Sequence, residues 1–119
     1  MSEITLFDRH GKAIAYIVED GAIYTWAGRA QCYLSDDKVY GWNGHHLGFI
    51  ADGTIFDLRG KRVGFTQQTC PVMTKMEPMK HMKKMQKMKH MKKMAKMRPM
   101  LSMGHSAASL EQFLQAGER

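Results

Sequence analysis

The sequence predicts an all-β fold: a small closed eight-stranded barrel of four pseudo-symmetric hairpin repeats, followed by an extended or disordered basic tail and a short C-terminal helix. Two regularities in the 119 residues carry this prediction. Glycine recurs at positions 11, 28, 44 and 60, so the spacing is 17, 16 and 16 residues. From Met73 to Met103 every third residue is methionine. The glycine period assigns residues 1–69 to the barrel, the methionine period assigns 70–105 to a low-complexity tail, and 106–119 remain as a terminal segment.

Aromatic and aliphatic residues flank each glycine at fixed offsets. The residue four positions before the glycine is aromatic: Phe7, Tyr24, Tyr40 and Phe56. The residue five positions after it is also aromatic: Tyr16, Tyr33, Phe49 and Phe65. The residue preceding the first aromatic is always aliphatic: Leu6, Ile23, Val39 and Ile55. Aromatic and β-branched residues on both sides of a turn favour two short strands, so each unit is predicted to be a β-hairpin.

The turns of these hairpins carry a local signal of their own. The first and last have the pattern Asp-x-x-Gly, at Asp8–Gly11 and Asp57–Gly60. Aspartate at the first position accepts backbone hydrogen bonds, and glycine supplies the positive φ of a type I turn with a bulge. We expect the second strands of the hairpins at 12–17, 29–34, 45–50 and 61–66. This spacing leaves no room for a helix before residue 67.

A lone hairpin cannot bury an apolar face, so the four copies are expected to close around a pseudo-four-fold axis, which also removes exposed sheet edges. Closure turns every repeated position into a ring of four. Small residues four positions after each glycine fit a crowded site near the axis: Ala15, Cys32, Gly48 and Gly64. The residues directly after each glycine form a basic ring that holds a phosphate or acidic headgroup, or are simply solvated turn charges: Lys12, Arg29, His45 and Lys61.

The period of three in the tail fits neither an α-helix nor a strand. Successive methionines would rotate around a helix and would alternate between the two faces of a strand. A three-fold polyproline-type helix instead places all eleven methionines on one ridge. The intervening residues are mostly good helix formers, whereas repulsion between lysines opposes a compact state. We therefore expect an extended or disordered tail, with a helix induced on binding as the alternative.

The terminal segment has clearer local signals. Ser109 and Gln112 have the spacing of a capping box, and Gly117 is placed to end a helix over residues 110–116. The sequence therefore predicts a short helix near the C-terminus.

Charge is divided unevenly between the two parts of the chain. Residues 1–70 carry seven Lys/Arg and eight Asp/Glu, whereas residues 71–119 carry eleven and three. A tail so basic points to an anionic surface, either lipid headgroups or nucleic acid. The run has no aromatic residue to stack on a base, which disfavours sequence-specific recognition of nucleic acid. The residues expected to bind the anion are Lys80, Lys83, Lys84, Lys87, Lys89, Lys92, Lys93, Lys96 and Arg98.

Two alternatives for the tail remain open. One is a passive, solubilising extension of a structural barrel. The other is a soft-metal site for Cu(I) or Ag(I), for which thioether and imidazole ligands are suited although the neighbouring cations repel a metal. The residues that would form this site are Met82, Met85, Met88, Met91, His81 and His90.

Other function classes find little support in the sequence. It has no Gly-rich phosphate loop, nucleophile–base pair or metal triad, so we expect a non-enzymatic interaction module without a cofactor. It has neither an 18-residue apolar run nor a secretory signal. We therefore expect a cytoplasmic protein, peripheral to a membrane if it meets one, with homo-oligomerisation left open.

Three further features have structural explanations. His45 and His46 are adjacent on a strand and point to opposite faces, so we expect a solvated turn rather than a metal pair. Trp26 and Trp42 occupy equivalent turn positions and are expected to pack against neighbouring hairpins, with a contact surface as the alternative. Cys32 is expected to be a small buried residue.

Taken together, the repeats resemble the four-fold β-flower family, a shallow symmetric barrel of four hairpins. The resemblance covers residues 3–67 and lies in the period rather than in any single residue. Tails of that family are rich in proline and lysine with a three-residue period, and end in a serine-rich stretch before a Glu-Gln-Phe-like segment. Ser106–Phe113 reads SAASLEQF, which is similar, whereas methionine stands where proline or valine is usual. The resemblance implies the fold but no established activity, and the family's likeness to tubby-type lipid-binding barrels is one of shape alone.

Overall fold

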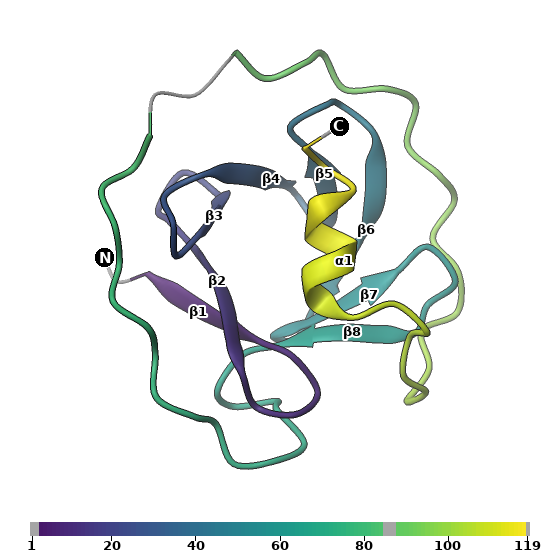
Figure 1. The fold of residues 1–119 in the computed structure, drawn as a ribbon. Helices are drawn as coiled ribbons and strands as arrows, with labels where there is room; N and C mark the ends of the chain where they lie inside the picture. Colours follow the sequence, from purple (N-terminus) through teal and green to yellow (C-terminus); the bar gives the residue numbers. More distant parts are fainter. Residues whose placement is uncertain (1–2, 85–87, 119) are drawn as a thin grey trace.

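The computed structural model describes residues 3–84 and 88–118, and its eight antiparallel strands close into a barrel in sequence order (Figure 1). The strands are β1 (Ile4–Phe7), β2 (Ala13–Ile17), β3 (Ala22–Thr25), β4 (Ala30–Ser35), β5 (Lys38–Gly41), β6 (His46–Ala51), β7 (Thr54–Asp57) and β8 (Arg62–Phe65). A short helix, α1 (Leu110–Gln115), follows the tail. The predicted barrel of four hairpins is confirmed, and each predicted second strand agrees with the structure to within one residue at either end.

All four hairpins share one irregularity, which is the predicted bulge. The register shifts after the aliphatic residue of the first strand, between Leu6 and Phe7 in the first hairpin and at the equivalent pair in the others. The four repeated glycines have φ between 82° and 92°. In the first turn the Asp8 carboxylate accepts hydrogen bonds from the backbone N–H groups of His10, at 2.9 Å, and Lys12, at 3.0 Å. The turn chemistry of the sequence therefore sets the hairpin geometry.

Two rings of side chains fill the barrel. The aliphatic ring is almost fully buried: Leu6, Ile23, Val39 and Ile55. The ring of small residues leaves space at one end of the axis, and helix α1 occupies it, since Leu110, Phe113 and Leu114 belong to the same core cluster as the aliphatic ring. An added Cβ at Gly64 would lie 2.8 Å from Leu110 Cδ1. The crowding predicted near the axis is therefore caused by the C-terminal helix, which the sequence did not place there.

The helix begins as predicted and ends differently. Ser109 Oγ accepts a hydrogen bond from the Gln112 N–H, and Gln112 Oε1 accepts one from the Ser109 N–H, both at 3.1 Å. The helix ends at Gln115, one residue before the predicted end. Gly117 does not adopt the left-handed conformation expected of a helix-ending glycine. A Cβ at this position would lie 2.7 Å from Cys32 Sγ, so glycine is required by close approach to the barrel instead.

The tail is extended and forms an outer layer around the barrel. Between residues 73 and 102 the described part adopts neither helix nor strand, and Figure 1 shows this segment running around the strands before it returns to α1. Of the conformations considered from the sequence, the structure shows the extended one, and the described part contains no induced helix. We call residues 73–103 the belt.

Candidate functional site: the lysine–methionine belt

The three-residue period gives the belt three rows with different surroundings. We call the methionines the outer row, the residue after each methionine the stacking row, and the residue after that the anchoring row. A three-fold extended helix keeps each row on its own side of the chain. The contacts of the described residues follow these rows.

The anchoring row ties the belt to the barrel through its backbone. Belt N–H groups donate hydrogen bonds of 2.8–2.9 Å to the carbonyl oxygens of the four repeated glycines. The pairs are Lys75 with Gly11, Lys84 with Gly28, Lys93 with Gly44, and Ser102 with Gly60. Nine belt residues, three steps of the methionine period, therefore match one hairpin of 16 or 17 residues.

The tryptophans provide a second set of anchors. The His81 N–H donates to the Trp26 carbonyl oxygen, and the His90 N–H donates to the Trp42 carbonyl oxygen, each at 2.9 Å. Nine residues further on, the anchoring row carries Pro99, which has no N–H to donate. The hydrogen bond that His81 and His90 donate therefore cannot be repeated at Pro99.

The stacking row places lysine ammonium groups over tyrosine rings of the barrel. Lys80 Nζ lies 4.7 Å from the ring centroid of Tyr16, and Lys89 Nζ lies 4.4 Å from that of Tyr33. The remaining pairs are Lys83 over Tyr24 at 4.8 Å, Lys92 over Tyr40 at 5.6 Å, and Lys89 over Trp42 at 5.7 Å. Each contact within 6 Å is an attractive cation–π interaction, so these lysines stabilise the closed belt as well as charging its surface.

The same row forms ion pairs elsewhere. Lys80 also pairs with Glu3. Arg98 Nη1 lies 3.1 Å from Asp37 Oδ2. A hydrogen bond from Lys38, assisted by the charge of Arg98, lowers the pKa of the Asp37 carboxyl. The stacking row thus contacts both aromatic and acidic groups of the barrel.

His46 links the belt to the barrel through its side chain. The ring is buried, Nε2 lies 2.8 Å from the Gly48 carbonyl oxygen, and Nδ1 accepts a 2.8 Å hydrogen bond from the Lys96 N–H. Nδ1 must be unprotonated to accept, so Nε2 carries the proton and donates to Gly48. Burial lowers the pKa of His46, which favours this neutral form. His46 is therefore a belt anchor, and the expectation of a merely solvated turn holds only for the exposed His45.

The outer row is open to solvent. The described methionines of the belt are 76–94% exposed. The described methionines form an apolar edge along the rim of the molecule, whose principal extents are 36 × 36 × 26 Å. The belt lysines beside them are exposed as well. The belt is thus an amphipathic rim, apolar at its outermost edge and cationic at its sides.

The residues predicted from sequence are distributed over these rows. Four of the predicted anion-binding residues belong to the stacking row above tyrosines: Lys80, Lys83, Lys89 and Lys92. Three belong to the anchoring row: Lys84, Lys93 and Lys96. Arg98 pairs with Asp37, and Lys87 lies outside the described residues.

The predicted soft-metal residues do not converge. Met82, Met88 and Met91 lie in the outer row, His81 and His90 lie in the anchoring row, and Met85 is outside the described residues. Consecutive methionines on such a helix are about 9 Å apart. Within residues 3–84 and 88–118, no group of three or more His, Cys, Asp or Glu residues is arranged to hold a metal ion.

The four residues of the predicted basic ring do follow equivalent turns but meet different partners. Arg29 pairs with Glu118 at 2.5 Å, and His45 Nε2 lies 3.2 Å from Lys93 Nζ. Lys12 and Arg29 line one cavity, whereas Lys61 packs beside Gly104. The C-terminal segment and the belt therefore divide the ring among separate environments.

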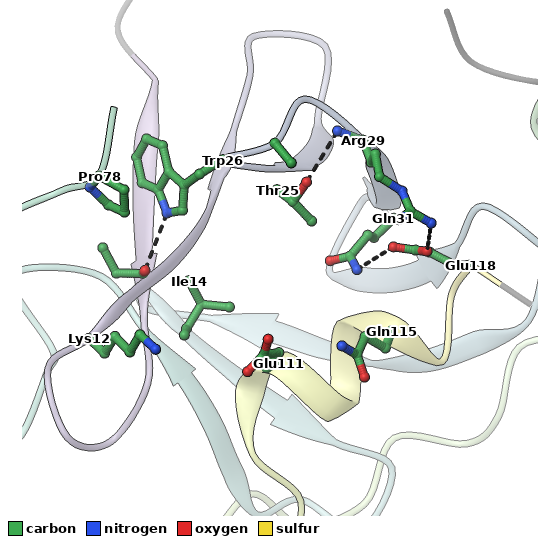
Figure 2. Close-up of a pocket in the computed structure, with 12 residues that line it drawn as sticks. Lys12, Ile14, Thr25, Trp26, Arg29, Gln31, Pro78, Glu111, Gln115 and Glu118 are labelled. Atoms are coloured by element: carbon green, nitrogen blue, oxygen red, sulfur yellow. Dashed lines mark hydrogen bonds and ion pairs between the residues drawn. The ribbon is translucent and has the colours of Figure 1, made fainter. Parts of the chain in front are cut away.

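That cavity, of about 520 Å³, lies between the first two hairpins, α1 and Pro78 (Figure 2). Gln31 and Arg29 both contact Glu118, and Lys12 and Glu111 project from opposite sides. Two cations and two carboxylates therefore line this cavity, and one of each, Arg29 and Glu118, pair with each other.

The tryptophans and Cys32 follow their structural predictions. Trp26 packs 5.0 Å from the Tyr16 ring, and Trp42 meets the Tyr33 ring edge-on at 6.0 Å, so each contacts the preceding hairpin. Cys32 is fully buried, and this burial strongly raises the pKa of its thiol.

The architecture defines a class of protein: a closed barrel of four repeated hairpins, encircled by its own period-three belt and closed at one end by a C-terminal helix. The chain belongs to the 4-fold beta flower protein family, which matches residues 4–114. The match runs through the belt into α1, so these segments belong with the barrel. Comparison with curated proteins and with solved structures gives no match.

Sequence reasoning missed the pairing between belt and barrel. The sequence does contain a signal for it: nine residues of the tail, three steps of the methionine period, correspond to one hairpin repeat. Lys80 and Lys89 are nine residues apart, and the tyrosines that they contact are 17 apart. The pairing becomes visible in the sequence only when the period of the tail is compared with that of the hairpins.

Proposed function

We propose that this protein is a non-enzymatic interaction module that docks on an anionic lipid surface through its belt. The observation that carries the proposal is the exposure of methionines and lysines along the same rim. Apolar side chains that insert between headgroups, beside cations that meet the headgroup charge, are the two components of interfacial membrane binding. No helix in the described part of the chain is long and apolar enough to cross a membrane.

Positive charge is not distributed evenly along the belt but is concentrated in one arc. Nine of the ten Lys/Arg residues of the belt lie between positions 80 and 98. This arc runs from the first hairpin to the third, as the contacts of Lys80 with Tyr16 and of Lys92 with Tyr40 indicate. A flat bilayer can meet only part of a curved rim. At a depth of about 5 Å, such a rim would insert roughly three methionines.

A lipid surface fits the rim better than nucleic acid does. Exposed thioethers gain free energy on leaving water for the headgroup–acyl boundary. On nucleic acid they would face phosphates, and the aromatic rings that could stack on bases lie beneath the belt lysines. The cationic arc alone would still attract duplex DNA at low salt, which makes DNA the appropriate competing target.

The test uses full-length protein with vesicles of phosphatidylcholine and 30 mol% phosphatidylserine, neutral vesicles, and duplex DNA, at about 50 and 200 mM salt. The informative variant replaces Lys84, Lys93 and Lys96 with glutamine. Glutamine keeps the backbone N–H groups that bond to the barrel, and it removes the three charges together with the contact of Lys93 Nζ with His45 Nε2. At about 1 kcal/mol per lysine, the triple variant should bind anionic vesicles roughly 100-fold more weakly. Lys75→Gln, in the anchoring row outside the charged arc, is the matched control and should bind nearly as wild type.

Absence of salt-sensitive vesicle binding would refute lipid docking. Stronger binding to DNA than to vesicles would assign the rim to nucleic acid instead. Binding to neither target would leave the soft-metal site and the passive extension, which a Cu(I) titration would separate.

A further inference from the structure

The methionines of this protein are confined to the solvent-exposed row of the belt. Apart from Met1, all eleven lie between positions 73 and 103, and the barrel core contains none. Methionine is normally a core residue that fills irregular gaps. Here the described methionines are at least 76% exposed. Their thioethers are therefore presented to solutes.

The belt stays in place without help from these side chains. Backbone N–H groups of the anchoring row bond to the barrel, as in Lys84 to Gly28. Ammonium groups of the stacking row lie over tyrosines, as in Lys89 over Tyr33. Neither kind of contact involves a sulfur atom. A chemical change confined to the outer row would therefore leave the belt attached.

The two thiols are less accessible than the methionines. Cys32 is fully buried, and burial raises its pKa, which suppresses the reactive thiolate. Cys70 is half-buried, with its Sγ 3.6 Å from the Asp8 carbonyl oxygen. An oxidant in solution thus meets the thioethers first.

We propose that the outer row is a site of reversible oxidation by peroxides, and that this oxidation releases the rim from the bilayer. A thioether sulfur attacks one oxygen of hydrogen peroxide, an S–O bond forms and the O–O bond breaks. The sulfur loses two electrons and becomes a sulfoxide, while the departing hydroxide takes the remaining proton and leaves as water. Methionine sulfoxide reductases reverse this change with a dithiol as reductant: the dithiol supplies two electrons and two protons and becomes a disulfide, and the sulfoxide oxygen leaves as water.

The release follows from the polarity of the product. A sulfoxide is polar, so the outermost edge no longer gains free energy on entering the headgroup–acyl boundary. The lysines keep their charge, and the barrel keeps its belt. This second part rests on the proposed lipid docking, whereas the oxidation itself does not.

The experiment treats full-length protein with hydrogen peroxide and follows intact mass, thermal unfolding and binding to the anionic vesicles. We expect about ten oxygen additions with little change in Tm, at least a tenfold loss of vesicle binding, and recovery of both mass and binding after treatment with the reductases. The matched control replaces the methionines of the charged arc with leucine, which is apolar but cannot form a sulfoxide. The replaced residues are Met82, Met85, Met88, Met91, Met94 and Met97. This variant should bind vesicles before and after peroxide.

The outcomes test separately the oxidation of the outer row and the release from the bilayer. Slow or incomplete oxidation, or unfolding in step with oxygen uptake, would overturn the assignment of the outer row as a tolerated oxidation site. Equal vesicle binding by reduced and oxidised protein would overturn the release. If the reduced protein fails to bind at all, lipid docking itself is wrong, and the mass and Tm data still decide the oxidation.

Discussion

The belt follows all four hairpins with the same backbone but with different side chains. Around the second and third hairpins its lysines stack on Tyr24, Tyr33 and Tyr40. The next equivalent positions of the barrel are phenylalanines, Phe49 in the third hairpin and Phe56 in the fourth. The nine-residue step of the stacking row leads there from Lys89 to Arg98 and from Lys92 to Leu101. The hydrogen bonds to the glycines are nevertheless present at every hairpin.

The backbone contacts and the side-chain contacts of the belt therefore have different roles. The backbone contacts set the register of belt against barrel and are repeated four times. The side-chain contacts are made where the barrel supplies tyrosine and thereby concentrate positive charge on one arc. Substitution of the glycines should therefore disturb the register of the belt against the barrel. Substitution of the lysines should change the charge of the belt without loss of the fold.

The largest effect is expected at a glycine beneath the belt. Gly28 has a φ of 92°, and an added Cβ would overlap the carbonyl oxygen of Met82. Gly28→Ala should lower the free energy of unfolding by about 2–4 kcal/mol, from backbone strain together with a lost hydrogen bond. Denaturant titration measures the loss, and limited trypsin digestion should show faster cleavage near Lys83 and Lys84 because the belt opens there.

Gly21 is the matched control. It has the same φ of 92°, but its added Cβ would meet the Leu34 carbonyl oxygen at 3.2 Å, and the three atoms nearest to it all belong to Leu34 rather than to the belt. Gly21→Ala should show the strain alone, about 1–2 kcal/mol, with unchanged trypsin sensitivity. Equal losses and equal digestion in the two variants would mean that the belt contributes nothing at Gly28.

A smaller effect is expected from protonation of His46. Its pKa is lowered by burial, so the folded state binds a proton less readily than the unfolded state. Stability is then complete above the ordinary histidine pKa of about 6.5 and is lost as pH falls below it toward the folded-state value. The loss should be on the order of 1 kcal/mol, since Nδ1 can no longer accept from Lys96.

Denaturant titrations between pH 7.5 and 5 measure this dependence, with His46→Asn as the reference. The variant should lose less stability over the same range than wild type. Identical pH profiles would show that the His46 link to the belt does not contribute.

The lysine–tyrosine contacts should each contribute less than a glycine anchor. Lys89 lies over two rings, Tyr33 and Trp42. Lys89→Gln should lower the free energy of unfolding by about 0.5–1 kcal/mol, the range of exposed cation–π contacts, as measured by denaturant titration. Lys75→Gln, in the anchoring row, serves as the control with almost no change. A loss of similar size in both variants would point to general charge effects rather than to the ring contact.

Local signals were sufficient to predict the barrel, whereas the docking of the belt is indicated only by a comparison of two periods in distant parts of the sequence. Asp8 and Gly11 specify their turn through their own hydrogen bonds and φ, so the hairpins could be predicted residue by residue. The three-fold helix of the tail could also be inferred from its period. Its docking could not be inferred from local signals, because each contact joins residues far apart in sequence, such as Lys75 and Gly11. The position of α1 could not be predicted for the same reason, because an apolar helix face does not indicate which surface of the protein it packs against.

The smallest effect on stability is expected in the outer row. Met91 is 90% exposed, and its sulfur makes none of the contacts that hold the belt. Met91→Gln should change the free energy of unfolding by less than about 0.5 kcal/mol, as for most surface substitutions. The same substitution at Met82, Met88, Met91 and Met94 together should still leave stability nearly unchanged in denaturant titration while it weakens binding to anionic vesicles. Unfolding of the fourfold variant would show that the methionines support the belt, and the separation between an anchored inner side and a free outer edge would then be wrong.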